Sequence, residues 1–133
     1  MFLKGYTSRR CKVPVDGCFE WQKLDAPGKK KQPYAIAMRS GEPFAMAGIW
    51  KEYADKATAG FVRTFAIAPC EPNELMATIQ DRMPVSLAPE DYMRWLGPQS
   101  DPSDLLKPYP SDLMKYGRSP MWALATRATS STK

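Results

Sequence analysis

The amino-acid sequence predicts an α+β domain made mainly of antiparallel strands, with short helices inserted late in the chain. Short segments that alternate polar and apolar side chains recur between turn signals, which is typical of antiparallel strands. The 133 residues include 13 prolines, which interrupt the chain too often for long helices. We therefore expect one domain with a mainly antiparallel, partly open, barrel-like sheet.

The first two expected strands flank a turn signal. Residues 10–15 (R-C-K-V-P-V) alternate in polarity, Asp16-Gly17 is typical of a turn, and residues 18–24 (C-F-E-W-Q-K-L) alternate again. Together these segments predict a β-hairpin. A basic loop, residues 25–32 (D-A-P-G-K-K-K-Q), follows it.

The remaining segments are assigned from periodicity and from the positions of proline and glycine. We expect strands at residues 34–38, 44–50, 61–68 and 83–87, helices at 72–79 and 89–96, a loop or short helix at 51–59, a linker at 97–104 and one helical turn at 112–116. Residues 1–116 would form the domain. Residues 117–133 would form a divergent, disordered tail, because the end of the chain is small, polar and without an apolar pattern.

Charge and composition restrict the functional classes. The net charge is +5, and Asp16, Glu20 and Asp25 are the only acidic residues before Arg39. A basic first third suits a polyanion such as nucleic acid, although a solvated basic face is the alternative. The chain has no histidine, which excludes Ser-His-Asp triads, Cys-His dyads and zinc sites of the Cys/His type.

The cysteines and the hydropathy of the chain indicate in which cellular compartment it is located. Cys11, Cys18 and Cys70 are odd in number and lack C-x-x-C spacing, which favours reduced thiols. No segment reaches transmembrane length, and the N-terminus lacks a secretory pattern. We expect a cytoplasmic monomer with no cofactor, metal or membrane partner.

Glu20 is the first candidate for chemistry. It stands between Phe19 and Trp21 in an expected strand. A carboxyl group beside apolar rings tends to have a raised pKa, which suits general acid–base catalysis. The alternative is an exposed, outward-facing strand residue.

A second candidate cluster follows the expected helix at residues 72–79. Asp81 and Arg82 lie between apolar neighbours, where an arginine could hold a phosphate through two hydrogen bonds. An ordinary loop ion pair is the alternative. Aromatic side chains could stack on bases and the lysine run could touch phosphates, with core packing and a solvated loop as the alternatives; these residues are Trp21, Tyr34, Phe44, Trp50 and Lys29 to Lys31.

Five ordered segments carry a family resemblance. They are R-C-K-V-P-V-D-G-C-F-E-W-Q-K (10–23), K-K-Q-P-Y (30–34), G-E-P-F-A-M-A-G-I-W (41–50), N-E-L-M-A-T-I-Q-D-R-M-P-V (73–85) and L-L-K-P-Y-P (105–110), with P-E-D at 89–91. In this order they resemble the SOS response-associated peptidase (SRAP) family, which includes the abasic-site processing proteins. The resemblance runs from about Arg9 to about Met114.

The resemblance implies a DNA-damage (SOS) response protein that binds abasic sites in single-stranded DNA. In the family, the cysteine exposed after removal of the initiator methionine is implied to form a thiazolidine ring with the sugar aldehyde, which crosslinks protein to DNA. The same residue is implied in an autopeptidase reaction. The implied fold is that of the SRAP domain.

Some positions of the implied site can be carried over to this chain. The resemblance places a catalytic glutamate at Glu20 and puts Gln80 where the family has histidine. A glutamine can only hydrogen-bond and cannot shuttle a proton near neutral pH. For DNA binding, the resemblance and the charge pattern point to four residues: Arg82, Trp21, Arg10 and Asp81.

The chain departs from the family pattern at both ends. It begins Met1-Phe2 where the family begins Met-Cys-Gly-Arg, and after Lys115 it loses the expected W-P run, as a frameshift would produce. We therefore expect a partial copy with an incomplete SRAP fold that lacks the N-terminal catalytic segment. Whether it is an enzyme stays open: the alternatives are a crosslinking peptidase or lyase-like protein, a non-catalytic single-stranded DNA-binding remnant, and a non-functional truncated product.

Overall fold

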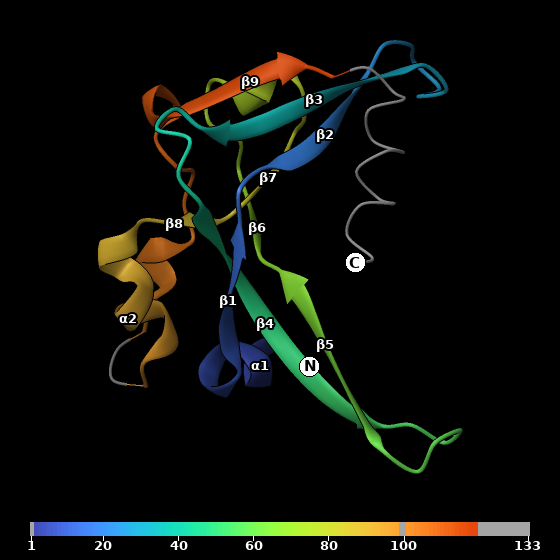
Figure 1. Cartoon of the computed structure of the whole chain (residues 1–133), viewed down its shortest axis with the longest axis vertical. Helices are drawn as coiled ribbons and strands as arrows, with labels where there is room; N and C mark the ends of the chain where they lie inside the picture. Colours follow the sequence, from blue (N-terminus) through green and yellow to red (C-terminus); the bar gives the residue numbers. More distant parts are fainter. Residues whose placement is uncertain (1, 99–100, 120–133) are drawn as a thin grey trace.

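The computed structural model describes residues 2–98 and 101–119. In this part of the chain, a four-stranded, a three-stranded and a two-stranded antiparallel sheet are bordered by short helices (Figure 1). The expected α+β class is confirmed. The sheets stay open and do not close into a barrel.

The four-stranded sheet, called the first sheet below, is built around the longest strand. Strand β4 (Phe44–Ala54) pairs with β1 (Arg10–Val15) on one side and with β5 (Phe61–Ile67) on the other, and β8 (Ser86–Leu87) joins near its start. The expectation of a loop or short helix at residues 51–59 is wrong for residues 51–54, because β4 continues to Ala54 and keeps its register with β5. Residues 55–59 do lie in a loop, the one that joins these two strands.

The three-stranded sheet, called the second sheet, contains β2 (Cys18–Lys23), β3 (Lys31–Met38) and β9 (Met114–Arg118), with β3 in the centre. The predicted hairpin between residues 10–15 and 18–24 is therefore wrong. Both strands exist, but β1 pairs with β4 while β2 pairs with β3. The Asp16-Gly17 signal marks the point at which the chain leaves one sheet for the other.

The C-terminal part of the described chain also differs from expectation. The single turn of 3-10 helix η4 (Ser111–Leu113) is followed by β9, where we expected a helical turn. Gly117 and Arg118, which we assigned to the tail, pair with Ala35 and Tyr34 of β3. The expected disorder of residues 120–133 lies outside the described residues.

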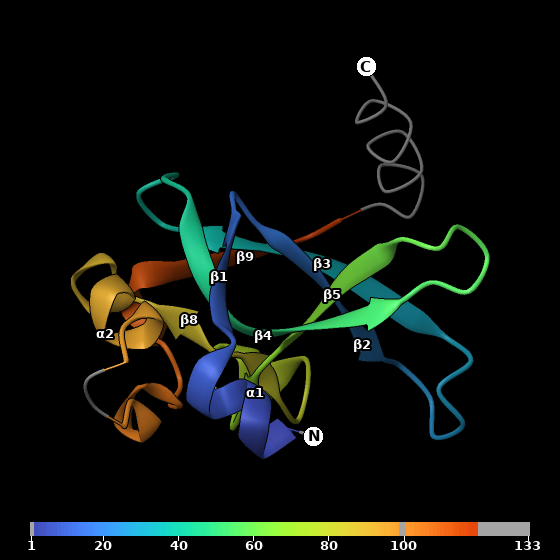
Figure 2. The same ribbon diagram turned by 90° about the horizontal axis from the view of Figure 1, so that it is seen from below.

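Helices are short and lie at the margins. The expected helix at residues 89–96 is present as η2 (Pro89–Asp91) and α2 (Tyr92–Leu96), whereas the one at 72–79 shrinks to η1 (Met76–Thr78). Sequence patterns did not predict α1 (Phe2–Ser8). Figure 2 shows α1 and α2 on one side of the molecule, with the loop between β4 and β5 directed away from α2.

Three further short elements complete the described chain. Strands β6 (Pro69–Cys70) and β7 (Met83–Pro84) pair with each other, and η3 (Ser103–Leu105) lies in the expected linker. The strand expected at residues 83–87 is thus divided between β7 and β8, which have different partners. No helix among the described residues has the length and hydropathy needed to cross a membrane.

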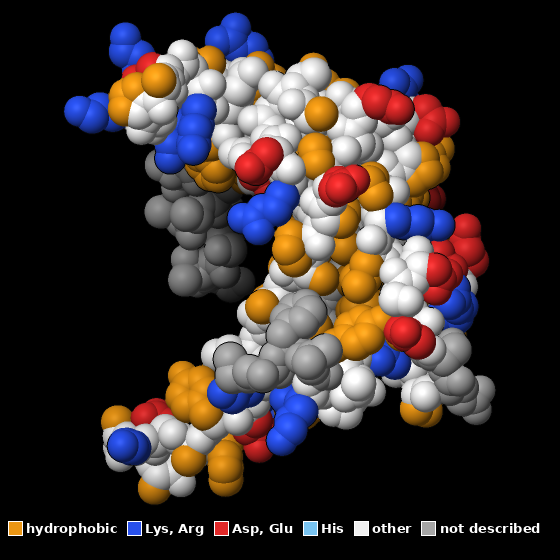
Figure 3. Space-filling view, turned by 180° about the vertical axis from the view of Figure 1, so that it is seen from behind, with side chains coloured by type: hydrophobic (Ala, Val, Ile, Leu, Met, Phe, Trp, Pro, Cys, Tyr) orange, Lys and Arg blue, Asp and Glu red, His pale blue; other side chains and the backbone are white. Residues whose placement is uncertain are grey.

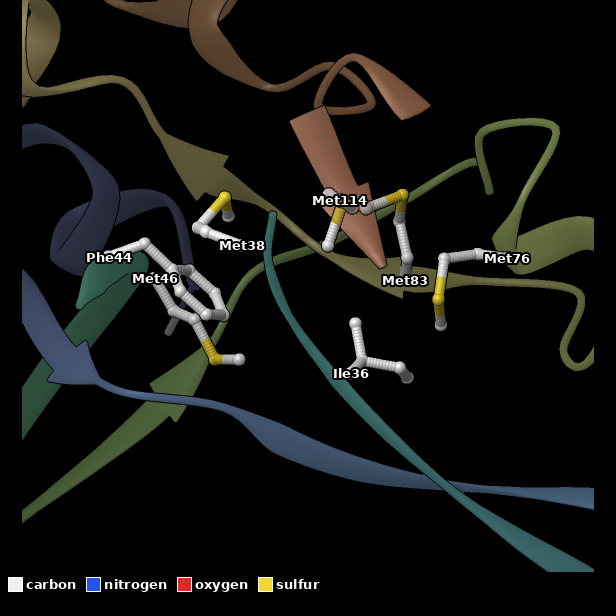
Figure 4. Packing of buried hydrophobic residues seen from close by; sticks show 7 residues of the cluster. All are labelled: Ile36, Met38, Phe44, Met46, Met76, Met83 and Met114. Carbon is white, nitrogen blue, oxygen red and sulfur yellow. The ribbon is translucent and has the colours of Figure 1, made fainter. Parts of the chain in front are cut away.

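The core between the two sheets is rich in methionine (Figure 4). Methionine is unbranched and fills irregular gaps, which suits a core between sheets of different strand direction. Its seven buried members are Ile36, Met38, Phe44, Met46, Met76, Met83 and Met114. A second cluster surrounds Trp95, which is fully buried and donates its indole N–H to the carbonyl of Cys11 at 2.8 Å.

Candidate functional site

An open cleft lies where β2, the end of β5, β6 and β7 converge. Its volume is about 380 Å³. The polar part of its wall is formed by Glu20, Gln80, Asp81 and Arg82. The apolar part is formed by Ile67, Ala68, Pro69, Met83 and Pro84. The structure therefore brings together residues that are some sixty positions apart in the sequence and that we had selected from two separate patterns.

Glu20 points into this cleft from the middle of β2. The strand holds it opposite Tyr34 of β3, and its side chain is half-buried. Burial raises the pKa of the Glu20 carboxyl above its ordinary value. The direction agrees with the expectation from its apolar neighbours, and it suits a group that exchanges protons with a bound molecule.

Gln80 is held against β2 by its own side chain. Its Nε2 donates a hydrogen bond to the backbone carbonyl of Trp21, the residue next to Glu20. A second side chain spans the same junction, because Gln22 Nε2 donates to the carbonyl of Thr78 at 2.8 Å. The Gln80 side chain thus links the segment after η1 to the second sheet. The sequence motif alone did not indicate this structural role.

Arg82 and Asp81 stand at the open rim of the cleft. Both side chains are exposed. The ion pairs found in the described part of the chain are Arg63–Glu52 and Arg94–Asp104, so the loop ion pair that we considered for Arg82 is not formed there. Its guanidinium is therefore available to an anion from solution.

Two expected DNA-binding residues lie outside this cleft. Arg10 donates from Nε to the carbonyl of Trp95, and from its terminal nitrogens to the carbonyls of Tyr6 and Gly97. Its guanidinium also lies 5.7 Å from the centre of the Trp95 ring. Arg10 thus connects β1 to α1 and α2. Trp21 is half-buried in β2 and supports the cleft through its carbonyl.

The other aromatic candidates are divided between core and surface. Phe44 is buried in the methionine-rich core. Tyr34 packs against Tyr116 with ring centres 5.3 Å apart and donates to Gln22 at 3.3 Å. Trp50 lies under the guanidinium of Arg63.

The three cysteines are free thiols with raised pKa values. Burial raises the pKa of Cys18 to about 11, with a smaller contribution from the charge of Glu20, and burial also raises the pKa of Cys11 and Cys70. Because the thiolate is the nucleophile, these thiols are poor nucleophiles at neutral pH. Within the described ranges, no cluster of potential metal ligands is found.

Asn73 is a site-supporting residue that the sequence did not single out. Its buried amide donates to the carbonyl of Tyr109 at 2.7 Å, and its Oδ1 accepts from the backbone N–H of Met76 at 2.8 Å. These bonds fix the turn that leads into Gln80 and Arg82. The sequence does contain a signal that could have identified Asn73, because a Pro-Asn pair directly before a short helix is typical of a turn fixed by the asparagine side chain.

One face of the molecule is hollowed. Figure 3 shows this hollow between two projections, the β2–β3 turn and the β4–β5 hairpin, with Lys and Arg side chains on both projections. The β2–β3 turn carries Lys29 and Lys30, which are exposed. An extended anionic chain lying in the hollow would meet basic side chains on both sides.

The fold and site define a small α+β domain with open antiparallel sheets and a polar cleft between them. It matches the family described as SOS response associated peptidase (SRAP) over residues 1–128. The abasic site processing protein YoqW of Bacillus subtilis is 38% identical over 118 residues, which are 86% of this chain and 51% of that protein. This chain therefore belongs to the SRAP family.

Further relatives agree with this assignment. The abasic site processing protein YedK of Escherichia coli is 36% identical over 85 residues, 62% of this chain and 35% of YedK. A solved structure of a protein from Bacteroides thetaiotaomicron is similar with a TM-score of 0.82 and 32% identity, covering 93% of this chain and 55% of the other. The chain spans about half the length of YoqW and of the Bacteroides protein.

Proposed function

We propose that this chain is the part of an abasic-site processing protein that holds single-stranded DNA at a base-free sugar. The observation that carries the proposal is the convergence of Glu20, Gln80, Asp81 and Arg82 on one open cleft. The names of the relatives from Bacillus and Escherichia support the substrate class. The net charge of +5 suits a nucleic-acid partner.

The rim of the cleft is suited to binding phosphate, and its interior is suited to binding a sugar. Arg82 at its rim is the cation that can hold a backbone phosphate through two hydrogen bonds. Glu20 and Asp81 line the same space, and their charges disfavour a phosphate inside it. A neutral sugar without its base therefore fits the interior, while its flanking phosphates stay at the rim.

Glu20 is the proposed proton donor and acceptor in this cleft. A carboxyl whose pKa is raised by burial can hold a proton nearer to neutral pH than an exposed one. It could thus protonate the oxygen of the sugar aldehyde or remove a proton from the adjacent carbon. Gln80 can supply a hydrogen bond and fix the geometry, but not a proton.

We further propose that these residues bind without forming a covalent crosslink. The described cleft wall contains carboxylates, an amide and a guanidinium, and it includes no amine or thiol side chain. Cys11, Cys18 and Cys70 are internal, so none of them carries the adjacent free amine that a thiazolidine ring requires. Their raised pKa values make direct attack on an aldehyde slow as well.

Fluorescent single strands with and without one abasic site test the proposal. We expect tighter binding to the abasic strand, an affinity that falls with salt, and no adduct in a denaturing gel. Equal affinity for the two strands would overturn the substrate assignment. An adduct that survives denaturation would overturn the non-covalent part alone.

A further inference from the structure

Two neighbouring pockets lie between the β3–β4 turn, α2 and the segment before η4. Their volumes are about 180 Å³ and 190 Å³, and Leu87 of β8 and Tyr109 line both of them. Figures 1 and 2 show α2 and β8, which border the pockets, on the side of the molecule away from the β4–β5 hairpin. Among the described residues, those that line the cleft at Glu20 line neither pocket. The two pockets together, named the groove below, are therefore separate from the candidate site.

The walls of the groove are rich in tyrosine and proline. Tyr92 of α2 lines one pocket, and Tyr109 stands between the two. Both rings are half-buried, so part of each is accessible to a ligand. The prolines of the groove are Pro43, Pro89, Pro108 and Pro110. Because proline fixes φ, the backbone around the groove loses little conformational freedom when a ligand binds.

Hydrogen bonds to the rest of the fold hold the segment that carries Tyr109. The carbonyl of Tyr109 accepts a bond of 2.7 Å from the buried amide of Asn73. Four residues later, the carbonyl of Leu113 accepts a bond of 2.8 Å from the backbone N–H of Arg39 in the β3–β4 turn. The floor is closed by Leu87, which is 2% exposed. The groove is thus preformed, as sites that bind short ligands usually are.

The charge of the groove is opposite in sign to that of the whole chain. Three carboxylates and two cations line it, whereas the chain has a net charge of +5. The carboxylates are Glu42, Glu90 and Asp91, and the cations are Arg39 and Lys107. In the part of the chain that the structure describes, none of the five belongs to an ion pair. The groove therefore disfavours a phosphate backbone and favours a basic ligand.

The shape of the groove favours a peptide in the polyproline II conformation. This helix has about three residues per turn, so side chains three positions apart lie on one edge and can enter the pockets on either side of Tyr109. Strand addition is disfavoured, because Pro89, Pro108 and Pro110 lack the backbone N–H that a new strand would bond. A helical ligand needs a continuous apolar groove, whereas the Tyr109 ring divides this one.

We propose that the groove binds a proline-rich peptide segment that carries arginine or lysine beside its prolines. The prolines would fill the two pockets against Tyr92 and Tyr109, and a basic side chain would pair with Glu42 or Glu90. A partner protein held in this way would leave the cleft at Glu20 accessible. Because the groove and the cleft have different lining residues, the proposal does not depend on abasic-site binding.

Fluorescence anisotropy with labelled peptides tests the proposal on the full 133-residue chain. The probe A-P-L-P-P-R-R has a P-x-x-P core and a basic end, A-P-L-P-P-E-E reverses the charge, and A-A-L-A-A-R-R removes the prolines. We expect the first probe to bind about tenfold or more tightly than either control. Non-specific attraction to a chain of net charge +5 would instead favour the acidic probe. Equal affinity for the three probes, or no binding of the first, would overturn the proposal.

Amide NMR spectra of the unaltered chain locate the bound probe. We expect A-P-L-P-P-R-R to shift resonances of residues 39–43, 87–92 and 107–113, which carry the groove. Shifts confined to the residues around Glu20 would place the peptide in the cleft and overturn the proposal. Shifts of the groove residues on addition of oligothymidylate would show that a nucleic acid occupies this surface instead, which would also overturn it.

A pair of charge variants tests the contact with the basic end of the peptide. Burial, followed by the charge of Glu90, raises the pKa of Tyr109, which places this carboxylate near the ring that divides the groove. E90Q, at an exposed position, should leave the chain folded and weaken the first probe by about two- to fivefold, the range for one exposed ion pair. The control E71Q removes an exposed carboxylate outside the groove and should leave the affinity unchanged. Equal effects of E90Q and E71Q would overturn the proposal.

Discussion

Gln80 donates its side-chain amide to the backbone carbonyl of Trp21, and this bond joins the two walls of the candidate cleft. On one wall, Trp21 follows Glu20 in β2. On the other, Gln80 precedes Asp81 and Arg82. Gln80, which the family resemblance placed at a histidine position, thus sets the distance between the wall that carries Glu20 and the wall that carries Asp81 and Arg82.

Replacing Gln80 with alanine should therefore loosen the cleft as well as the fold. The change removes one hydrogen bond and leaves the half-buried Trp21 carbonyl without this donor, which should lower the free energy of unfolding by about 1 kcal/mol. Urea unfolding measures this loss. Affinity for abasic single strands should fall at the same time, because the segment carrying Arg82 is no longer fixed.

Gln22→Ala is the matched control for this change. Gln22 spans the same junction with a solvent-exposed bond to the carbonyl of Thr78, and its Oε1 also accepts a long bond, 3.3 Å, from the hydroxyl of Tyr34. Because water can replace the donor at Thr78 and the bond from Tyr34 is long, Gln22→Ala should cost less stability than Gln80→Ala. A Gln80→Ala protein that is as stable as wild type, or less affected than Gln22→Ala, would contradict the role assigned to Gln80.

Glu20 should make stability depend on pH in a defined direction. Burial raises its pKa in the folded protein, so the ionised carboxyl is disfavoured by folding. The cost is absent below the pKa of glutamate in the unfolded chain, grows as pH rises, and is complete above the raised folded pKa. Glu20→Gln should thus be stabilised relative to wild type at neutral pH, and this advantage should shrink under acid conditions.

Urea unfolding of both proteins across the acid range measures this difference. The same titration followed by DNA binding gives a second readout, since protonation of Glu20 removes a negative charge from the cleft. A stability difference between Glu20→Gln and wild type that stays constant with pH would show that the carboxyl does not titrate as its environment requires.

Arg82 should account for part of the salt dependence of DNA binding. If it neutralises one phosphate, Arg82→Ala should reduce the slope of log affinity against log salt by about 0.7, the value per contact for a single strand. Lys107→Ala, in the segment after η3 and outside the cleft wall, should leave the slope unchanged. Equal slopes for wild type and Arg82→Ala would remove Arg82 from the binding surface.

The sequence was sufficient to predict the strands but not their partners. Local alternation identifies residues 10–15 and 18–24 as strands, and both are present, as β1 and as β2, which ends one residue earlier at Lys23. Asp16-Gly17 is also a correct turn signal. However, a turn of this composition can close a hairpin or let a strand leave its sheet, and only the long-range pairing of β1 with β4 decides between them.

The same limit applies to the candidate site. Glu20 and Arg82 were identified by local composition and motif, and both line the cleft. The bond from Gln80 to Trp21 and the position of Arg10 depend on how distant segments pack, which no local pattern contains. Likewise, residues 114–118 form a strand because β3 offers them an open edge, although their composition permits a helical turn.

Arg10 should prove to be a structural residue. Its guanidinium donates to the carbonyls of Trp95, Tyr6 and Gly97, and a lysine cannot reproduce this fork. Arg10→Lys should therefore lower the free energy of unfolding by roughly 1.5–3 kcal/mol, the range for a hydrogen bond to a charged group. Guanidinium chloride unfolding measures the loss.

The neighbouring Arg9 provides the control. It donates one bond, from Nε to the carbonyl of Trp50 at 3.1 Å, so Arg9→Lys should cost less. DNA affinity of Arg10→Lys, measured where the protein is fully folded, should equal that of wild type. A loss of affinity under those conditions would instead support the DNA contact that the sequence led us to expect.

Gly17 should be required where the chain passes between the two sheets. A Cβ atom at this position would lie 2.9 Å from the carbonyl oxygen of Ile36, a backbone atom of the central strand β3. Strand β3 cannot move away without disturbing its hydrogen bonds to β2 and β9, so Gly17→Ala should lower the free energy of unfolding by about 1–3 kcal/mol.

Gly117→Ala is the control, because a Cβ there meets nothing within 4 Å. That change should be neutral or slightly stabilising, since alanine restricts the unfolded chain. Equal unfolding midpoints for Gly17→Ala and Gly117→Ala would show that the crossing can adapt and that glycine is not what permits it.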